Sequence, residues 1–322
     1  MHFGKLENET LERLILSKFA RTRPEVLTKL QTGIDCAALD FSGDMIVLST
    51  DPITAAKSRL GYLTVHINCN DAAAFGAVPI ALLVTILAPH GTTENDLSSL
   101  ADEIADAAKS IGVDIIGGHT EITDAVTRIV TSSTVIARAK INKSAREIFD
   151  GDSIVMTKCA ALEGTAVLAL DECISSTLSD GEIFFAQKLI EKISVVKEGL
   201  IASDLGAHAM HDVTEGGVLG AVFEMVAPFN LGAVIDTGKI PILSITKKLC
   251  TAMNLDPLRL ISSGSLLIAC SNPDTIIEAL AKNGIKATNI AHVTKNRDVI
   301  TIEGAQISPP KPDEIYSAKN RI

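Results

Sequence analysis

The chain has 322 residues, of which 47% are hydrophobic and only 3% aromatic, and it contains no Trp. This length is enough for two ordinary domains or one large one, with a core built from Ala, Val, Ile and Leu. The formal net charge of −10 argues against a broad nucleic-acid-binding surface and against a face for anionic membranes, because both need a basic patch.

The N-terminus and the cysteines bear on the cellular compartment. The stretch MHFGKLENETLERLILSKF carries acidic residues early and lacks the basic-then-apolar pattern of a signal peptide. The longest apolar run, residues 79–89, is far shorter than the ~18 residues that span a bilayer. The six cysteines show neither a CxxC pair nor zinc-ligand spacing. These features predict a cytoplasmic protein with reduced thiols and no membrane partner.

The first half of the chain alternates between predicted helices and strands. An amphipathic helix is expected over 9–19, and a strand over 44–52 ends in a turn, because Pro52 disfavours helical geometry at the residue before it. A helix over about 60–77 is closed by a glycine and a proline. A strand is expected over 80–89 and a helix over 92–112. A strand over 113–118, a loop over 119–125 and a strand over 126–140 follow.

Residues 141–152 mark a domain boundary, because charged residues, Gly and Asp break all periodicity there. We therefore expect domains at 1–145 and 152–322. The predicted strands of the second half are 153–158, 232–236, 265–270 and 298–302, and its helices lie near 163–171, 182–192 and 216–228. Strands that alternate with helices in both halves predict α/β or α+β layers.

An aspartate lies in an unusually apolar setting. Asn70 and Asp71 lie among small apolar residues in NCNDAAAFGAVP (68–79), within the predicted buried helix. Burying a carboxylate without a partner costs several kcal/mol or more. The segment offers no local cation, since Lys57 and Arg59 lie more than two turns away. A paired buried aspartate and a metal or substrate contact are both open at this point.

Four further acidic motifs accompany Asp71. GID, STDP, GGHTE and HDVTEGG contribute Asp35, Asp51, Glu121 and Asp212. Carboxylates on several separate elements suit a hard cation, because Mg²⁺ prefers oxygen ligands and usually binds a few carboxylates, water and substrate phosphates. A triphosphate approaches several aspartates only when a metal lies between them. Taken singly, Asp35 and Asp51 are also typical turn residues.

Two glycine pairs, Gly117–Gly118 and Gly216–Gly217, would let backbone N–H groups approach an anion closely. The second pair begins a predicted helix, whose N-terminus favours phosphate. His119 follows the first pair, although a lone histidine is more often structural than catalytic. Lys158, at a strand end, is either a phosphate contact or a solvated lysine. No GxxxxGK[ST] loop and no GxGxxG after a strand occurs, so a nucleotide would bind on another scaffold.

In chain order the motifs GIDCAAL, STDP, GYLTVHINCNDAAAFGAVP, GGHTE and HDVTEGGVLGAVFEM resemble the aminoimidazole ribonucleotide synthetase (PurM-like) superfamily across essentially the whole chain. The combination of NDxxxxGAxP with DxTxGG is specific. This superfamily includes the hydrogenase maturation protein HypE, selenophosphate synthetase and thiamine-monophosphate kinase, and the chain looks closest to the HypE-like branch. The resemblance implies an α/β (α+β) two-domain fold whose N-terminal sheet pairs across a homodimer, with ATP in a cleft between the domains.

The resemblance also implies roles for individual residues. Asp35, Asp51 and Asp71 would hold Mg²⁺ and the phosphates, and Asn70 would order that loop. The residues assigned to the nucleotide are Asn70, Gly117, Gly118, Thr120, Glu121, Thr214, Gly216 and Gly217. Lys158 is added to them as a possible phosphate contact. The residues assigned to catalysis are Asp71, His119 and Asp212.

The implied chemistry is transfer of the ATP γ-phosphate to an amide, carbamoyl or small-metabolite acceptor. Two features depart from HypE. The chain ends YSAKNRI, without the tail cysteine that carries the carbamoyl group, and His119 stands where an aspartate is usual, which favours fewer bound metal ions. Three alternatives stay open: a non-catalytic ATP-binding scaffold in hydrogenase assembly, a thiamine-phosphate-kinase-like enzyme, and a metal-dependent hydrolase of phosphate esters.

Overall fold

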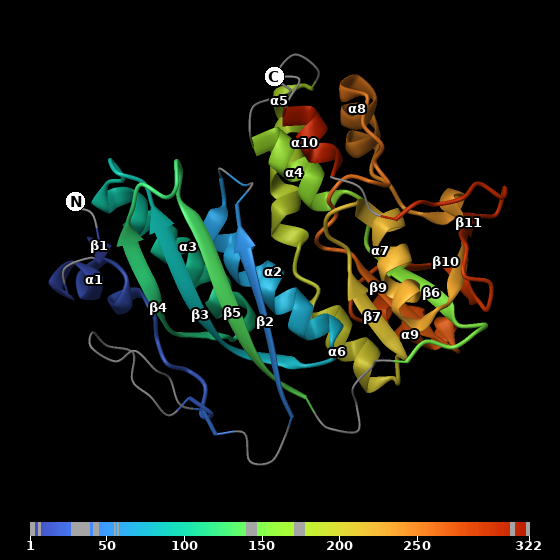
Figure 1. Cartoon of the computed structure of the whole chain (residues 1–322), viewed down its shortest axis with the longest axis horizontal. Coiled ribbons are helices and arrows are strands. Elements are labelled where there is room, and N and C mark those ends of the chain that lie inside the picture. Colours follow the sequence, from blue (N-terminus) through green and yellow to red (C-terminus); the bar gives the residue numbers. More distant parts are fainter. Residues whose placement is uncertain are drawn as a thin grey trace. The chain divides into compact units, whose positions relative to one another are not determined.

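The chain forms two compact units in the computed structural model (Figure 1). Unit 1 comprises residues 1–72 and 77–141, and unit 2 comprises residues 73–76 and 142–322. The structure describes residues 4–5, 8–26, 39–40, 45–54, 56, 58–139, 147–170, 178–309 and 313–319.

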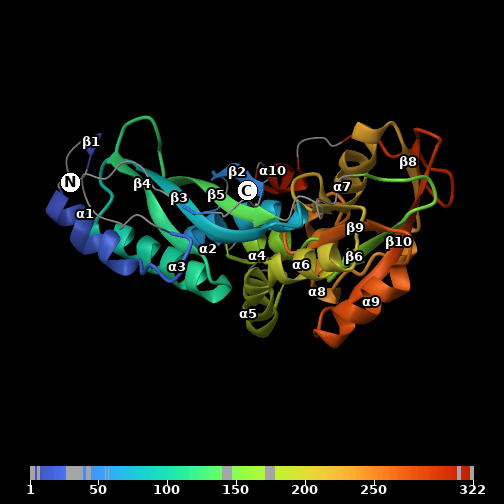
Figure 2. The same cartoon turned by 90° about the horizontal axis from the view of Figure 1, so that it is seen from below.

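Unit 1 is built on a five-stranded sheet in the order β1-β4-β3-β5-β2. β3 and β4 run parallel, and the other neighbouring strands are antiparallel. The strands are β1 (Gly4–Lys5), β2 (Met45–Ile53), β3 (Val78–Ala88), β4 (Asp114–Ile122) and β5 (Val130–Ala139). The helices are α1 (Asn8–Leu14), the 3-10 helix η1 (Leu16–Lys18), α2 (Leu60–Ala74) and α3 (Glu94–Ile111). Figure 2 shows α2 and α3 on the same face of this sheet.

The ends of α3 are set by the signals that the sequence carries. The Thr93 side chain accepts a hydrogen bond from the Asp96 N–H, and the Asp96 carboxylate accepts one from the Thr93 N–H, which is a capping box. Gly112 ends the helix in the left-handed conformation at φ 68°. The helix predicted over 92–112 is therefore confirmed.

α2 is buried on nearly all sides, so its polar side chains need partners within the unit. The hydroxyl groups of Thr64 and Thr131 lie 2.6 Å apart, which links the helix to β5. Gly61 lets α2 approach α3 closely, since a Cβ there would lie 2.7 Å from the Glu103 Cβ and 2.9 Å from the Leu100 carbonyl oxygen. The helix and the sheet are thus joined by polar contacts as well as by apolar packing.

β4 is longer than the sequence predicts. The predicted loop over 119–125 is wrong for residues 119–122, which continue the strand. The backbone there is held from both sides, because Ala88 of β3 pairs with Ile122 and Lys5 of β1 pairs with Glu121. Pairing on both sides outweighs the low strand propensity of GGHTE, and the motif lies on a strand.

Unit 2 is built on a six-stranded sheet in the order β11-β8-β10-β6-β9-β7. β8 and β11 pair in parallel, and the other neighbours are antiparallel. The strands are β6 (Ser153–Thr157), β7 (Ala209–Asp212), β8 (Gly232–Ile235), β9 (Leu266–Cys270), β10 (Ala287–Thr294) and β11 (Val299–Thr301). The α-helices are α4 (Leu162–Leu170), α5 (Asp180–Lys188), α6 (Val196–Asp204), α7 (Gly217–Val226), α8 (Ser244–Met253), α9 (Pro273–Lys282) and α10 (Glu314–Lys319). Short 3-10 helices lie at η3 (Leu189–Lys192), η4 (Ala227–Phe229) and η5 (Thr237–Lys239).

Several elements of unit 2 have no counterpart in the sequence prediction: α6, α8, α9, α10, β7 and β10. For α9 the signal is present, because the Asn272 side chain caps the helix and Pro273 occupies its first turn. β7 has only four residues and owes its existence to pairing with β9. The four strands and the helices α4 and α7 that the sequence predicts are confirmed.

None of the described helices combines the length and the apolar character that crossing a membrane requires.

Replacing Gly61 with Ala should destabilise unit 1 by about 1–2 kcal/mol. The added methyl group meets backbone atoms of α3 at 2.9 Å, and this overpacking outweighs the roughly 1 kcal/mol gained from better helix propensity. Urea-induced unfolding followed by circular dichroism measures the change. Gly181→Ala in α5 is the matched control, because nothing lies within 4 Å of its Cβ, and it should be neutral or stabilising. Equal effects of the two substitutions would contradict the close approach of α2 and α3.

Candidate functional site

Two of the predicted acidic residues of unit 1 lie on facing elements. In β2 the alternate residues Ser49 and Asp51 are partly buried, whereas their neighbours in the strand are exposed. The Ser49 hydroxyl group donates to Asp71 Oδ2 at 2.6 Å, and the Asp51 backbone N–H donates to Asn68 Oδ1 at 2.8 Å. Asn68 and Asp71 are three residues apart on α2 and therefore share a helix face. The structure thus brings Asp51 and Asp71 to one region between β2 and α2.

The surroundings of Asp71 supply oxygen atoms and no reactive thiol. The neighbouring Cys69 is fully buried, and burial together with the Asp71 charge raises the pKa of its thiol far above the usual value. Burial of this kind favours the protonated thiol, which argues against Cys69 as a nucleophile. The donor set around Asp71 is therefore of the hard, oxygen-rich type.

Ser49 and Asn68 are site residues that the sequence analysis does not identify. The Asn68 side chain accepts from the Asp51 backbone and donates to the Thr64 carbonyl oxygen at 3.0 Å, so it ties β2 to α2. Its signal in the sequence is an amide side chain within an apolar segment, three residues before Asp71. Asn70 is also completely buried.

The GGHTE motif divides between the two faces of the sheet. Residues that pair across neighbouring strands lie on the same face of a sheet. From β2 to β4, Asp51 pairs with Ser133 of β5, Ser133 with Val84 of β3, and Val84 with Gly118 of β4. Position 118 therefore shares the face of Asp51. Side chains alternate along a strand, which places Thr120 on that same helix-covered face and His119 and Glu121 on the opposite one. Thr120 is buried, in line with this alternation.

His119 and Glu121 form their own pair on the far face. Their side chains meet at 2.9 Å, His119 Nε2 to Glu121 Oε2, and each is about one third exposed. The structure does not bring them together with Asp51 and Asp71, because they face away and β3 and β5 lie between β4 and β2.

Gly117 and Gly118 serve the packing of two strands. A Cβ at Gly118 would lie 1.8 Å from the Val84 carbonyl oxygen, and its φ of 149° also requires glycine. A Cβ at Gly117 would lie 3.1 Å from Leu83 Cδ2. The close approach of the β3 backbone therefore explains Gly118 without a ligand, whereas Gly117 meets only the end of a flexible side chain.

Among the residues that the structure describes, no group of three or more His, Cys, Asp or Glu side chains is placed to hold a metal ion. Asp35, the third predicted ligand, lies outside the described residues. The sequence-predicted metal set is therefore represented by Asp51 and Asp71.

In unit 2 the turn before α7 requires its glycines. Gly216 and Gly217 have φ values of 81° and 63°, and a Cβ at Gly217 would lie 2.5 Å from the Leu258 carbonyl oxygen. The Thr214 carbonyl oxygen accepts from the Gly217 N–H at 3.2 Å. The Gly216 N–H donates to Asp313 Oδ2 at 2.8 Å. The amide expected to face a phosphate thus binds a carboxylate of the chain itself.

Asp313 belongs to an acidic cluster that the sequence analysis does not predict. Its carboxylate is buried, which raises its pKa, and it also accepts from the Ile315 N–H at 2.9 Å. Nearby, Glu215 accepts from the Tyr316 hydroxyl group at 2.8 Å, and this bond helps raise the Tyr316 pKa to about 12. The C-terminal helix α10 is therefore anchored to the turn before α7 through two carboxylates.

Glu163, at the start of α4, adds a third carboxylate to this cluster. Burial, together with the charges of Asp313 and Glu215, raises the pKa of Glu163 to about 7, against an opposing effect of Ser263. Its Oε2 atom is buried and has no hydrogen-bond partner among the described residues. The sequence signal is the one that singles out Asp71, namely a carboxylate within an apolar helix.

Lys158 is largely buried and is held by contacts within unit 2. Its ammonium group donates to the Ser194 carbonyl oxygen at 2.6 Å and to the Lys192 carbonyl oxygen at 3.0 Å, and it pairs with Glu198 Oε1 at 2.6 Å. Burial lowers the Lys158 pKa, and the Glu198 charge partly offsets this effect. All three ammonium donors are used within unit 2, which favours a structural role over the predicted phosphate contact.

Asp212, a predicted catalytic residue, lies at the end of β7 and is buried, with 5% of its surface exposed.

Comparison with known proteins extends over both units. Residues 33–139 match the family described as AIR synthase related protein, N-terminal domain, and residues 150–303 match its C-terminal domain. The chain is similar to a putative hydrogenase expression/formation protein of Methanocaldococcus jannaschii, with 29% identity over 93% of this chain and 91% of that protein. It is also similar to the carbamoyl dehydratase HypE of Rhizobium leguminosarum bv. viciae, with 29% identity over 82% of this chain and 78% of that protein.

Solved structures share the fold. The crystal structure of Escherichia coli HypE has a TM-score of 0.80 at 22% identity, over 95% of this chain and 98% of that chain. A structure of HypE in complex with ATP has a TM-score of 0.77 at 20% identity, over 95% of both chains. The two-domain PurM-like fold expected from the motifs is thereby confirmed. With both family domains matched in order and HypE proteins among its relatives, the chain belongs to the AIR synthase-related, PurM-like family, in the HypE-like branch.

Proposed function

We propose that the protein is a Mg²⁺-dependent, ATP-binding enzyme that transfers the γ-phosphate of ATP to an amide, carbamoyl or small-metabolite acceptor and so activates it. Two kinds of relative support this proposal: proteins named carbamoyl dehydratase HypE and a HypE whose structure contains ATP. The observation that carries it in this chain is the placement of Asp51 and Asp71 on facing elements with oxygen-bearing neighbours.

The residues around Asp71 fit a magnesium ion. Mg²⁺ is usually held by one or two carboxylates together with substrate phosphates and water, and Asp51 and Asp71 supply that number. Ser49 and Asn68 hold the two positions in place through hydrogen bonds of 2.6 and 2.8 Å. When bound, Mg²⁺ would supply positive charge that offsets the phosphate oxygens. Asp35 stays a predicted third ligand.

The protein's task in phosphoryl transfer is mainly to position groups and to balance charge. In unit 1, Ser49 fixes the direction of the Asp71 carboxylate, and Asn68 fixes the β2 backbone at Asp51. In unit 2, the Gly216 N–H donates to the Asp313 carboxylate, which supports an affinity of this turn for negatively charged groups. The roles assigned to Asn70, His119, Thr120, Asp212 and Thr214 stay predictions.

A non-catalytic ATP-binding scaffold is the second candidate function. It is favoured by the pairing of His119 with Glu121 on the far face of the sheet and by the occupation of the Gly216 N–H by Asp313. Both contacts reduce the number of groups available to a triphosphate. ATP binding without turnover in the presence of candidate acceptors would support this alternative.

We further propose that the sheet of unit 1 pairs across a homodimer. Ile46 and Leu48 lie on the face of β2 that points away from α2, and they are 52% and 62% exposed. Leu48 is in register with Ile136 of β5, which is already buried in the unit, so the exposed apolar side chains lie on the edge strand itself. A second copy of this face would bury these side chains.

Asp71→Asn should weaken Mg²⁺-dependent binding of a non-hydrolysable ATP analogue at least tenfold, because the amide cannot supply the negative charge that the metal needs. Isothermal titration calorimetry with and without Mg²⁺ measures the effect. Asp106→Asn on the exposed surface of α3 is the matched control and should bind like the unaltered protein. Full Mg²⁺-dependent binding by Asp71→Asn would overturn the assignment.

Glu163→Gln should flatten the pH dependence of stability between about pH 4.5 and 7. A carboxyl group whose pKa rises on folding from 4.5 to about 7 binds its proton more tightly in the folded chain. Its contribution is full below pH 4.5 and is lost as the pH rises through 7, which amounts to roughly 3 kcal/mol. Urea unfolding at pH 5 and pH 8 measures this difference.

The exposed Glu278→Gln is the matched control for that comparison and should keep the pH dependence of the unaltered protein. A Glu163→Gln variant with the same pH dependence as the unaltered protein would show that Glu163 is ionised in the folded chain near pH 5.

Leu48→Asp should convert the proposed homodimer into monomers, because it places a charge in the buried apolar face. Analytical ultracentrifugation measures the shift in mass. Ile302→Asp introduces the same charge at an apolar residue of unit 2 that is 56% exposed, and it should leave the dimer intact. An unchanged dimer in the Leu48→Asp variant would contradict this interface.

A further inference from the structure

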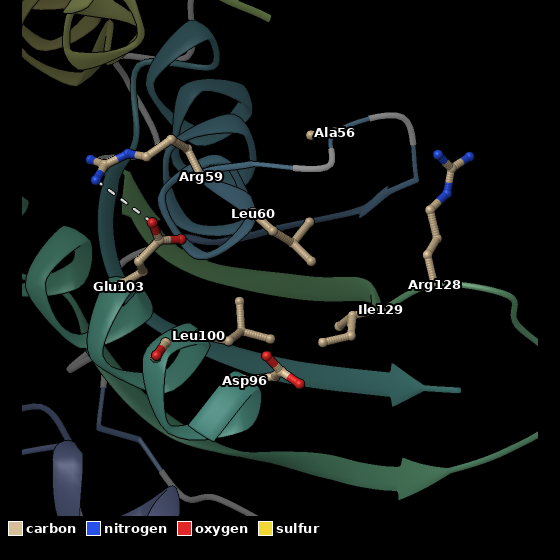
Figure 3. Close-up of a pocket in the computed structure, with 9 residues that line it drawn as sticks. Ala56, Arg59, Leu60, Asp96, Leu100, Glu103, Arg128 and Ile129 are labelled. Carbon is tan, nitrogen blue, oxygen red and sulfur yellow. Dashed lines mark ion pairs between the residues drawn. The ribbon is translucent and has the colours of Figure 1, made fainter. Parts of the chain in front are cut away.

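Unit 1 contains a cavity of about 380 Å³ that the proposed function does not use (Figure 3). It lies where the first turn of α2, the flank of α3 and the segment before β5 meet. Asp71 lies eleven residues beyond Leu60 along α2, which corresponds to roughly 16 Å of helix. The cavity is therefore a separate feature from the acidic region between β2 and α2.

The walls of the cavity are apolar in the middle and charged at the rim. Leu60, Leu100 and Ile129 point toward one another across it, and Arg59 and Arg128 lie at opposite ends (Figure 3). A volume of this size falls in the range of small-molecule sites, which combine apolar walls with a few polar groups that fix orientation.

Both acidic residues of the cavity already have partners. Glu103 Oε2 accepts the Gly61 N–H at 3.1 Å, and Glu103 Oε1 lies 3.6 Å from an Arg59 guanidinium nitrogen. Asp96 accepts from the Thr93 N–H and hydroxyl group, and these hydrogen bonds lower its pKa. The charge of Asp96 is also offset by the N-terminus of α3.

The arginines, in contrast, keep unused donors. Arg128 is exposed and makes no hydrogen bond or ion pair within the described part of the chain. Arg59 Nε is buried and lacks a hydrogen-bond partner among the described residues. Arg59 also holds a φ of 59°, a left-handed conformation that is costly for a residue with a side chain and that recurs at ligand sites.

The acidic residues of the cavity already have partners, whereas its arginines keep unused donors and its walls are apolar. This combination suits an anion that also has an apolar part. We infer that this cavity binds a small organic anion, a carboxylate or a phosphate monoester, whose charged group lies at Arg128 and whose aliphatic part lies against Leu60, Leu100 and Ile129. Arginine suits both anions, because its planar fork of donors matches carboxylate and phosphate oxygens.

The test uses isothermal titration calorimetry of the full chain with three probes of similar size: butyl phosphate, hexanoate and uncharged 1-hexanol. At least one anion should bind more tightly than 1-hexanol. Arg128→Gln should weaken that binding about tenfold or more, as expected for the loss of a hydrogen bond to a charged group. Arg297→Gln, which removes an exposed arginine of unit 2, is the matched control and should bind like the unaltered protein.

The outcomes separate the anion classes and the two sites. Preference for butyl phosphate assigns the cavity to phosphate monoesters, and preference for hexanoate assigns it to carboxylates. Failure of both anions to bind, or binding that Arg128→Gln leaves unchanged, would overturn the inference. It would also be overturned if Arg128→Gln weakened binding of the Mg²⁺–ATP analogue equally, since Arg128 would then belong to the nucleotide site. Asp71→Asn should keep anion binding even if it loses the nucleotide.

Discussion

The structure of unit 1 depends on how α2 satisfies polar groups inside an apolar environment. Only Tyr62 and Asp71 of this helix are not fully buried, yet the helix also carries Thr64, Asn68 and Asn70. Each buried polar group that lacked a partner would cost about 1–3 kcal/mol, so α2 must lie where β2 and β5 offer donors and acceptors. The hydrogen bond between Asn68 and the Asp51 backbone meets part of this demand, and with the Ser49–Asp71 hydrogen bond it also builds the candidate magnesium site.

Two buried carboxylates of unit 2 are accommodated differently, one by an ion pair and the other by a raised pKa. Glu198 is paired with the ammonium group of Lys158, whose remaining donors bind two backbone carbonyl oxygens. Glu163 forms no ion pair within the described part of the chain, and burial, together with nearby carboxylate charges, raises its pKa to about 7. The first arrangement fixes a segment of the fold, whereas the second leaves a group that changes charge near neutral pH.

The glycine pairs show that one sequence pattern can have two physical causes. Gly118 is required because the β3 backbone occupies the space of a Cβ, and this concerns packing alone. Gly216 and Gly217 adopt positive φ values in the turn before α7, where an N–H group faces a carboxylate. Only the second pair behaves as an anion-binding turn, and there the anion in place is Asp313 from the C-terminal segment.

The sequence by itself determined the alternation of strands and helices, the ends of α3 and the family, because periodicity, caps and specific motifs are local signals. It also singled out Asp71, since a carboxylate among apolar residues demands a partner wherever the chain folds. The tertiary structure alone decided what those residues meet. Strand pairing turned residues 119–122 of the predicted loop into part of β4 and so sent His119 and Thr120 to opposite faces. Contacts between residues far apart in sequence joined Gly216 to Asp313 and Lys158 to Glu198, and such partners leave no periodic trace along the chain.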